Sequence, residues 1–359
     1  MTESGKRPPR MLKYFEAINE ALGQLLEADG DVYVQGLGAD APLGIFGTTR
    51  GLAERFPDRV LDMPSSEAGM AGIALGSTIL GYRPILVHMR VDFSILAMDQ
   101  MVNQIAKWHF MYGGKMRAPM VFRMIVGRGW GQGPQHSQSL QAWFAHVPGF
   151  RVVMPTTARD VKGMLIAATA SDAPVAIFEH RWLYDIRDDV PEGMYETSLD
   201  TAKILRPGKH VTIAATSYMA LESMRAAETL ATIGIDAEVI DIRSLVPLDI
   251  DTIAGSARKT GHLLVADTGT LDFGITGEIV SRVTEREFAS LKQAPRRIGL
   301  PFAPSPTAPE LAEKFFPRAP DIARAAAELV GADANALPVE PPLADRWHDR
   351  PDLTFTGPY

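Results

Sequence analysis

The sequence predicts an α/β protein with two doubly wound domains, each built on a mostly parallel sheet. Short β-branched runs alternate with helical patterns along most of the chain, and such alternation is typical of a parallel sheet covered by helices on both faces. The chain has 359 residues, which is enough for two domains of about 150 residues each. Its 31 glycines and 26 prolines indicate many tight connections between elements.

The first series of elements lies within residues 11–185, which we expect to form the first domain. Its strand-like runs are short and rich in β-branched and other apolar side chains, and they fall at residues 32–34, 84–88, 120–126, 151–153 and 175–178. Helical patterns lie between these runs. One of them covers residues 93–112, where the apolar stripe consists of Ile95, Met98, Met101, Val102 and Ile105.

The alternation weakens over a charged stretch, and we expect residues 186–207 to be a linker. A second series at residues 208–330 predicts the second domain. Its expected strands and helices fall at residues 211–215, 220–233, 237–242, 250–257, 263–267 and 322–329. We expect residues 1–10 to form an N-terminal arm. Residues 331–359 contain five prolines, and we expect an extended tail that is disordered or lies on a partner.

Composition excludes several classes of protein. Lysine and arginine total 36 against 43 aspartates and glutamates, and the net charge of −7 argues against a general nucleic-acid-binding protein. The chain has no cysteine, which excludes disulfides, thiolate zinc sites, iron–sulfur clusters and cysteine nucleophiles. Residues 69–82 are too few and too rich in glycine to span a bilayer, and residues 1–10 lack the apolar core of a secretory signal. We therefore expect a soluble, cytoplasmic protein without nucleic-acid or membrane partners.

The common single-chain enzyme motifs are absent from the sequence. The glycine-rich segment 127–133 fits neither the G-x-G-x-x-G spacing of dinucleotide-binding loops nor the Gly-Lys-Ser/Thr ending of a phosphate-binding loop. A G-x-S-x-G nucleophile elbow and an H-E-x-x-H helix are also missing. The eight histidines are scattered, so we expect no metal ligands in this chain.

Glu67 is a candidate site residue at the start of an expected helix. Ser66 precedes it, and a plain N-terminal cap with an acid in the first turn has the same pattern. The helix carries glycines on nearby faces, at Gly69, Gly72 and Gly76. Because each glycine costs about 1 kcal/mol against alanine in a helix interior, we expect another backbone to approach this face closely. This predicts a tight helix–helix contact beside Glu67, either within the chain or between subunits.

His136 and Phe93 are two further candidates. His136 lies between the glycine-rich segment and a helix expected near Ser139, on the carboxyl side of a strand, which is where α/β sheets bind ligands. Its imidazole could serve as an acid or base near neutral pH, or it could simply donate to nearby backbone. Phe93 by itself fits a core position better than a ligand contact.

In order, these segments resemble the beta subunit of the thiamine-diphosphate-dependent decarboxylase component of 2-oxo acid dehydrogenases. The resemblance is to the pyruvate and acetoin dehydrogenase type, in the transketolase-like superfamily, and it covers about residues 11–330. The matching segments are Thr49-Arg50-Gly51-Leu52, 64–69, 93–103 (which contains Asp99-Gln100), Tyr112-Gly113-Gly114, 136–139, 146–149, 237–249 and Lys259-Thr260-Gly261-His262. So many matches in the same order make the resemblance specific.

The resemblance implies a pyrimidine-binding domain followed by a transketolase-type C-terminal domain. It also implies that this chain holds half of an active site in an α2β2 heterotetramer. In this family a Gly-Asp-Gly motif followed by asparagine holds the cofactor's diphosphate and its Mg²⁺ on the alpha subunit, and the sequence contains no Gly-Asp-Gly. Further implied partners are a lipoyl acyltransferase core and a small 2-oxo acid substrate, with a structural K⁺ held by main-chain carbonyls.

The resemblance also assigns roles to four residues. Glu67 matches the glutamate that hydrogen-bonds the aminopyrimidine ring nitrogen and promotes its imino tautomer, so that the cofactor deprotonates its own thiazolium carbon. Phe93 matches the aromatic residue packed on the pyrimidine, and Met89 occupies the adjacent strand-end position. His136 matches a histidine near the substrate that transfers a proton or takes part in reductive acylation of the lipoyl group.

The sequence departs from the family pattern at several positions. Leu37 stands where the family carries an acid that links the paired active sites through proton transfer, and Asp40 is a candidate substitute. Ser65 replaces an aliphatic residue. Arg128 and Trp130 add bulk to a loop that is normally almost all glycine, which could narrow or re-specify the substrate pocket. Residues 267–273 also lack the usual acidic, glycine-rich pattern.

These observations predict a beta subunit that, with an alpha subunit, decarboxylates a 2-oxo acid oxidatively and passes the acyl group to lipoamide. One alternative is a two-component thiamine-dependent transferase that forms acyloins or acts like a transketolase outside a dehydrogenase complex. Another is a non-catalytic assembly subunit that keeps the fold. The presence of Glu67 and His136 argues against the second alternative.

Overall fold

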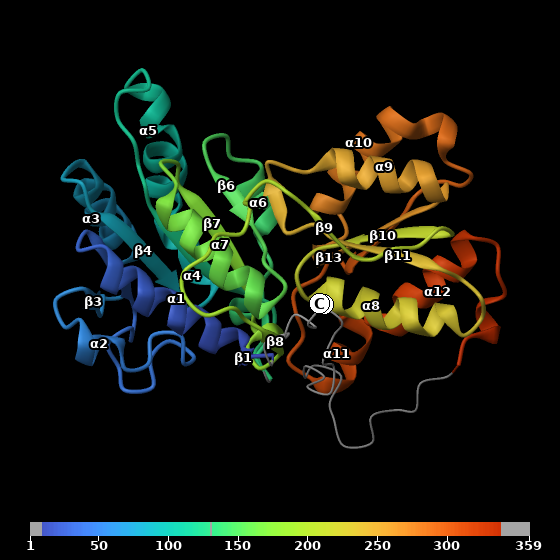
Figure 1. Ribbon diagram of the computed structural model, residues 1–359, viewed down its shortest axis with the longest axis horizontal. Coiled ribbons are helices and arrows are strands. Elements are labelled where there is room, and N and C mark those ends of the chain that lie inside the picture. The colour runs from blue at the N-terminus through green and yellow to red at the C-terminus, as the bar shows by residue number, and fades with distance from the viewer. Residues whose placement is uncertain (1–8, 130, 339–359) are drawn as a thin grey trace, which may run out of the picture.

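The computed structural model describes residues 9–129 and 131–338 (Figure 1). The expected N-terminal arm and the expected Pro-rich tail lie mostly outside the described residues, as does Trp130. The described chain forms two α/β domains, and each domain has a sheet with helices on both faces. In the described part of the chain, no helix is long and apolar enough to cross a membrane.

The first domain contains a seven-stranded sheet in the order β12-β6-β7-β5-β4-β2-β3. All neighbours except β12 and β6 pair in parallel. The strands from this domain are β2 (Val32–Gly36), β3 (Val60–Leu61), β4 (Arg83–His88), β5 (Val121–Val126), β6 (Arg151–Val153) and β7 (Val175–His180). The predicted runs at 32–34, 84–88, 120–126, 151–153 and 175–178 all fall on these strands. They read as continuous apolar runs because a parallel sheet is buried on both faces.

Helices cover both faces of this sheet. They are α1 (Tyr14–Ala28), α2 (Leu52–Arg55), α3 (Glu67–Ile79), α4 (Val91–Ser94), α5 (Ala106–Met111), α6 (Gln141–Ala145) and α7 (Ala158–Ala170). On one face α1 and α7 pack together over strand residues that include Val34 and Ile85. On the other face α3 packs over the next residues in the alternation, Leu86 and Phe122. The period-2 alternation of each strand thus supplies two separate cores.

The predicted helix at 93–112 is interrupted. The chain passes from α4 through a 3₁₀ turn (Ile95–Ala97) and a π-helix (Asp99–Ile105) into α5. The wider turn of the π-helix changes the angular period of the side chains, so Met101 and Ile105 are buried while Ile95 is exposed. The prediction of one continuous amphipathic helix is therefore wrong for this segment.

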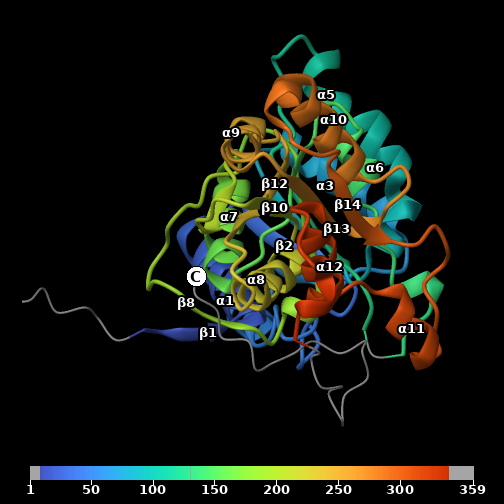
Figure 2. The same cartoon turned by 90° about the vertical axis from the view of Figure 1, so that its right-hand side faces the viewer.

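The second domain contains a five-stranded sheet in the order β14-β13-β10-β11-β9, parallel except for β9. Its strands are β9 (Lys203–Arg206), β10 (Val211–Ala215), β11 (Ala237–Asp241), β13 (Leu263–Thr270) and β14 (Arg296–Leu300). Its helices are α8 (Tyr218–Ala231), α9 (Ile250–Thr260), α10 (Ile275–Glu287), α11 (Pro309–Phe315) and α12 (Ala319–Leu329). Figure 2 shows α8 and α12 side by side on one face, where they form a separate apolar core.

A strand of the second domain completes the sheet of the first. β12 (Ser244–Val246) pairs antiparallel with β6, with Ser244 opposite Val153 and Val246 opposite Val152. A further antiparallel pair, β1 (Met11–Lys13) with β8 (Arg187–Asp189), ties the start of the first domain to its end. The expected linker at 186–207 therefore contains regular structure, since β8 and β9 both lie within it.

Buried polar contacts also join the two domains. Gln141 Nε2 donates to both carboxylate oxygens of Asp267 at 3.0 Å. Thr156 Oγ1 donates to Asp241 Oδ1 at 2.8 Å. Burial raises the pKa of Asp267, and burial together with the charge of Asp160 raises the pKa of Asp241 to about 7. Asp241 is the last residue of β11, and Asp267 lies in the second half of β13, so this edge of the second sheet faces the first domain.

Candidate functional site

The predicted site residues lie on segments that follow β3, β4 and β5. Glu67 is the first residue of α3, Met89 directly follows β4, Phe93 lies in α4, and His136 ends a 3₁₀ turn after β5. Because β3, β4 and β5 are parallel strands of one sheet, their carboxyl ends lie at one edge, where open α/β sheets bind ligands. The fold therefore places all four residues at the edge expected for a site.

The Glu67 carboxylate is buried and only partly satisfied. Its residue is 7% exposed, and its Oε2 accepts no hydrogen bond from any described residue. Ser66 occupies the N-cap position but makes no side-chain capping bond, so the reading of this pair as a plain helix cap is not supported. A buried acceptor without a donor is costly. This oxygen therefore fits a ligand that brings its own hydrogen-bonding nitrogen, as an aminopyrimidine ring does.

The α3 face beside Glu67 has no partner within the described chain. A Cβ at Gly76 would meet nothing within 4 Å, and a Cβ at Gly72 would only touch the side chain of Gln100. The next turn exposes Ile79 and the adjoining Leu80, the latter by 80%. The close helix–helix contact expected from the glycines is therefore not made within this chain, and the face is open to another subunit.

The structure brings Phe93 and His136 together. Their ring centroids lie 5.3 Å apart at 87°, an edge-to-face contact. The His136 ring makes no hydrogen bond to any described residue and is exposed, so the reading of this histidine as a backbone donor is not supported. Met89 lies on the neighbouring turn, where its Cε would lie 3.7 Å from a Cβ on Gly38. Among the described residues, Glu67 makes no hydrogen bond to any of these three side chains.

Two polar residues next to Phe93, Arg90 and Asp92, make hydrogen bonds to the segment that carries His136. Arg90 Nη1 donates to the main-chain oxygen of Gly127 at 2.7 Å, and Arg90 Nη2 donates to Gln132 Oε1. Gln138 Nε2 donates to Asp92 Oδ1 at 2.7 Å. Burial and the nearby charge of Arg181 lower the pKa of Arg90 to about 10. The sequence gives no sign of either interaction, because the hydrogen-bond partners of Arg90 and Asp92 lie on the segment that follows the next strand, β5.

The glycine-rich segment is shaped by close contacts. Gly127 has φ +77°, and a Cβ there would lie 2.3 Å from His180 Nε2, so only glycine fits. Arg128 is fully buried and donates to the main-chain oxygens of Pro306 at 2.9 Å and Thr307 at 2.7 Å. The Arg128 guanidinium thus bonds to the second domain, and this residue does not line the cavity beside the segment.

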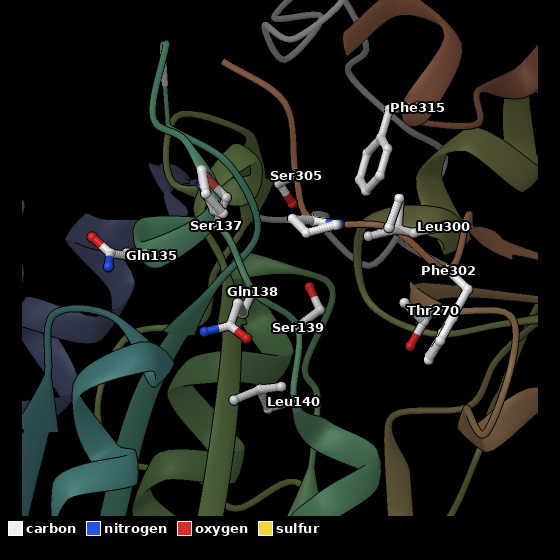
Figure 3. Close-up of a pocket in the computed structure, with 13 residues that line it drawn as sticks. Gln135, Ser137, Gln138, Ser139, Leu140, Thr270, Leu300, Phe302, Ser305 and Phe315 are labelled. Carbon is white, nitrogen blue, oxygen red and sulfur yellow. The ribbon is translucent and has the colours of Figure 1, made fainter. Parts of the chain in front are cut away.

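A cavity of about 500 Å³ lies between the His136 segment and the second domain (Figure 3). Leu300, Phe302 and Phe315 face Ser139 and Leu140 across it. None of its lining residues is charged, and Ser139 Oγ is buried without a hydrogen-bond partner among the described residues. The cavity therefore suits a largely apolar, uncharged group.

The structure of the turn after β2 does not support Asp40 as a substitute for the acid that Leu37 replaces. Leu37 and Asp40 are exposed, and the Asp40 side chain makes no hydrogen bond to any described residue. The carboxylate that the structure places against this turn is Asp62, whose Oδ1 accepts from the Gly38 N–H at 2.6 Å. Within residues 9–129 and 131–338, no group of three or more histidine, aspartate or glutamate side chains could hold a metal ion.

Family models match both domains. The model for the transketolase pyrimidine binding domain matches residues 10–186, and the model for the transketolase C-terminal domain matches residues 200–322. The beta subunit of acetoin:2,6-dichlorophenolindophenol oxidoreductase from Cupriavidus necator is 40% identical over 327 residues, covering 88% of this chain and 97% of the relative. The chain belongs to the transketolase-like family of dehydrogenase beta subunits.

Further comparisons agree with this membership. The mitochondrial pyruvate dehydrogenase E1 component subunit beta-2 of Oryza sativa is 39% identical over 316 residues, covering 87% of this chain and 84% of the relative. A solved structure, the split-gene transketolase inactive beta4 tetramer, matches with a TM-score of 0.74 over 89% of this chain and 99% of its own. At 23% identity that structure supports the fold alone.

Membership confirms the predicted family and the two-domain α/β fold. A pyrimidine-binding domain, together with these relatives, implies thiamine diphosphate as the cofactor of this beta subunit. The roles of Glu67, Met89, Phe93 and His136 remain predictions. The unsatisfied oxygen of Glu67 fits the aminopyrimidine end of that cofactor, and the contact between the Phe93 and His136 rings is compatible with a histidine near the substrate.

Proposed function

We propose that this beta subunit, together with an alpha subunit, decarboxylates a 2-oxo acid oxidatively and transfers the acyl group to lipoamide. The observation that carries the proposal is the buried, unsatisfied Glu67 oxygen at the start of α3, in a chain 40% identical to an acetoin dehydrogenase beta subunit. The relatives' names favour a dehydrogenase over a separate transferase or a non-catalytic subunit.

Three side chains would hold the aminopyrimidine end of thiamine diphosphate. Glu67 would share a hydrogen bond with a ring nitrogen, and Phe93 and Met89 would pack against the ring. When bound, the cofactor supplies a carbon nucleophile and an electron sink. The neutral ring nitrogen accepts, so the Glu67 carboxyl O–H would donate to it, and a hydrogen bond held out of water is stronger than one in bulk solvent. The position of Glu67 therefore supports cofactor activation.

His136 would move a proton near the substrate. Its ring is exposed beside Phe93 and makes no hydrogen bond to any described residue, so both nitrogens are available to a reacting group. An imidazole with this freedom can donate or accept near neutral pH. The proposal therefore gives His136 the proton transfer that accompanies decarboxylation or acyl transfer.

The proposal includes partners that complete the site. The alpha subunit would hold the diphosphate and Mg²⁺ in an α2β2 heterotetramer, and the open face of α3 would lie in a subunit contact. A lipoyl acyltransferase core would accept the acyl group, and main-chain carbonyls would hold a structural K⁺. We place the complex in the cytoplasm.

The test is an activity assay on the complex with its alpha subunit, thiamine diphosphate and Mg²⁺. Pyruvate and acetoin are supplied in turn, with an artificial electron acceptor, then a lipoyl domain, then an aldehyde. Glu67→Gln should lower turnover by about a hundredfold or more because cofactor activation is lost. The matched control is Glu313→Gln on α11, an exposed glutamate that should leave turnover unchanged. Acyl transfer to aldehydes alone would contradict the dehydrogenase assignment.

A further inference from the structure

Arg90, which precedes α4, and Asp92 and Phe93 within α4 contact the His136 segment at three separate points. Arg90 holds the beginning of that segment, Asp92 holds its end, and Phe93 meets the His136 ring. The segment is also closed on itself, because the Gly127 N–H donates to the Gln138 main-chain oxygen at 3.2 Å. Residues 90–93 thus contact both ends and the His136 ring of the segment formed by residues 127–129 and 131–138.

Arg90 is an unusual residue for this position. It is 2% exposed, and within the described chain it donates to no carboxylate. Its guanidinium instead lies over the Phe46 ring at 5.7 Å and bonds to Gly127 and Gln132. A buried guanidinium without an ion-pair partner is costly, and the Asp92 carboxylate acts on Arg90 only through its charge, without a hydrogen bond. Its use here is therefore to hold the glycine-rich segment, whose own side chains supply little packing.

Asp92 fixes the other end of the segment. Its Oδ1 accepts from Gln138, and Gln138 is two residues after His136. Between these ends the segment makes short internal bonds: Ser137 Oγ donates to the Gln132 main-chain oxygen at 3.1 Å, and the His136 N–H donates to Gly133 O at 3.2 Å. The backbone on both sides of His136 is therefore anchored to the turn that carries Phe93.

We propose that Arg90 and Asp92 are positioning residues that set the His136 ring against Phe93 and so toward the reacting atoms. This inference rests on the proposed function, in which His136 transfers a proton. Misplacing a catalytic group by about 1 Å can cost up to a hundredfold in rate. Loss of either anchor should therefore reduce turnover through His136 while leaving Glu67, Met89 and Phe93 to bind the cofactor.

The first test measures kinetics of the complex with its alpha subunit. Arg90→Met and Asp92→Ala should each lower kcat about tenfold, while the thiamine diphosphate concentration that gives half-maximal activity changes less than about twofold. Asp92→Asn keeps an acceptor oxygen for Gln138 and should retain most of the activity. Arg59→Met is the matched control, because Arg59 also donates to main-chain oxygens, those of Leu26 and Asp29, away from the site.

A double-variant cycle separates positioning from a merely structural role. If Arg90 acts through His136, adding Arg90→Met to a His136→Ala enzyme should cause no further loss of kcat, because residues that act as a unit are not additive. A second tenfold loss in the His136→Ala background would overturn the proposal. An unchanged kcat for Arg90→Met in the otherwise native enzyme would overturn it equally.

A second readout does not depend on activity. Arg128 is fully buried within the anchored segment, so trypsin should cleave after it slowly in the native complex. Arg90→Met and Asp92→Ala should raise the rate of cleavage at this bond about tenfold, measured by mass spectrometry, and Arg59→Met should not. If these variants are cleaved faster but the native complex has no decarboxylase activity, the proposed function is wrong while the anchoring of the segment by Arg90 and Asp92 stands. Unchanged cleavage in both variants would sink the positioning role.

Discussion

At the scale of single residues, His88 stands out because it is a polar ring held entirely within the apolar core. It ends β4, is buried, and stacks on Phe122 with ring centroids 6.3 Å apart and planes at 11°. Neither ring nitrogen has a hydrogen-bond partner among the described residues. Burial lowers the pKa of His88 to about 4, so the folded chain keeps this ring neutral.

Replacing His88 by phenylalanine should stabilise the protein, and more so in acid. As pH falls from about 6.5 toward 4, His88 binds a proton in the unfolded chain but stays neutral in the folded chain. The free energy of unfolding therefore decreases through this pH range. His88→Phe removes this loss and two unsatisfied nitrogens. The melting temperature should rise by about 2 °C at pH 7.5 and by more at pH 5. Scanning calorimetry at both pH values measures this.

The control for this prediction is His109→Phe, which changes an exposed histidine. It adds the same aromatic ring at the surface, so it should not raise the melting temperature at either pH. A His88→Phe gain that is equal at pH 5 and pH 7.5 would contradict the titration argument while leaving the packing argument in place.

The site residues that the sequence revealed lie in short recognisable segments, whereas the residues that it did not reveal depend on contacts between distant parts of the chain. Glu67, Met89, Phe93 and His136 were identified through segments that resemble a known family, and the structure places them at one sheet edge. Arg90 could not be found in this way, because its partner Gly127 is 37 residues away and no spacing rule connects them. Only the parallel pairing of β4 with β5 brings the two segments together.

At the scale of elements, Gly149 shows how closely α6, β6 and α5 approach. It has φ +114°, and a Cβ on it would lie 1.8 Å from the Ala106 main-chain oxygen. A side chain at this position must therefore move backbone rather than a flexible side chain.

Gly149→Ala should destabilise the fold by about 3 kcal/mol or more, because overlap with backbone adds to the strain of a left-handed conformation. Gly81→Ala is the matched control: it has φ +98°, and a Cβ there meets nothing within 4 Å. That change should cost about 1 kcal/mol through strain alone. Denaturant unfolding of both variants gives the difference. Equal losses would show that the contact with Ala106 is softer than the distance implies.

Elements that are long and apolar were predictable, and short edge elements were not. The expected elements at 211–215, 220–233, 237–242, 250–257, 263–267 and 322–329 all fall on strands or helices of the second domain, whereas α10 and β14 were not predicted. β12 and β9 are three and four residues long and lie at sheet edges, so neither has room for a recognisable alternation. The π-helix was missed because a stripe of apolar residues at helical spacing does not reveal a local change in turn width.

At the scale of the whole molecule, the open face of α3 makes assembly testable. Gly76 is exposed on that helix, and nothing lies within 4 Å of a Cβ built there. Gly76→Leu should therefore leave the isolated chain folded, or slightly stabilise it, since glycine costs about 1 kcal/mol in a helix. In the presence of the alpha subunit it should reduce complex formation at least about tenfold, because a bulky side chain blocks close helix approach.

A matched control exists on the second domain. Gly255 is an exposed glycine of α9 that also has nothing within 4 Å of a Cβ. Gly255→Leu should leave the sedimentation profile of the complex unchanged. If Gly76→Leu assembles as well as the native chain does, the α3 face is not in a subunit contact.

Because β12 is the edge strand of the first-domain sheet, that sheet cannot be completed until β12 has been synthesised. β6 ends at Val153, but its outer neighbour is not synthesised until Val246. At ordinary translation rates this interval lasts on the order of ten seconds. During that time the nascent first domain carries an unpaired strand edge, and the three-residue length of β6 keeps that edge too short to recruit another chain readily. A first domain cut away from the second would keep this edge open permanently.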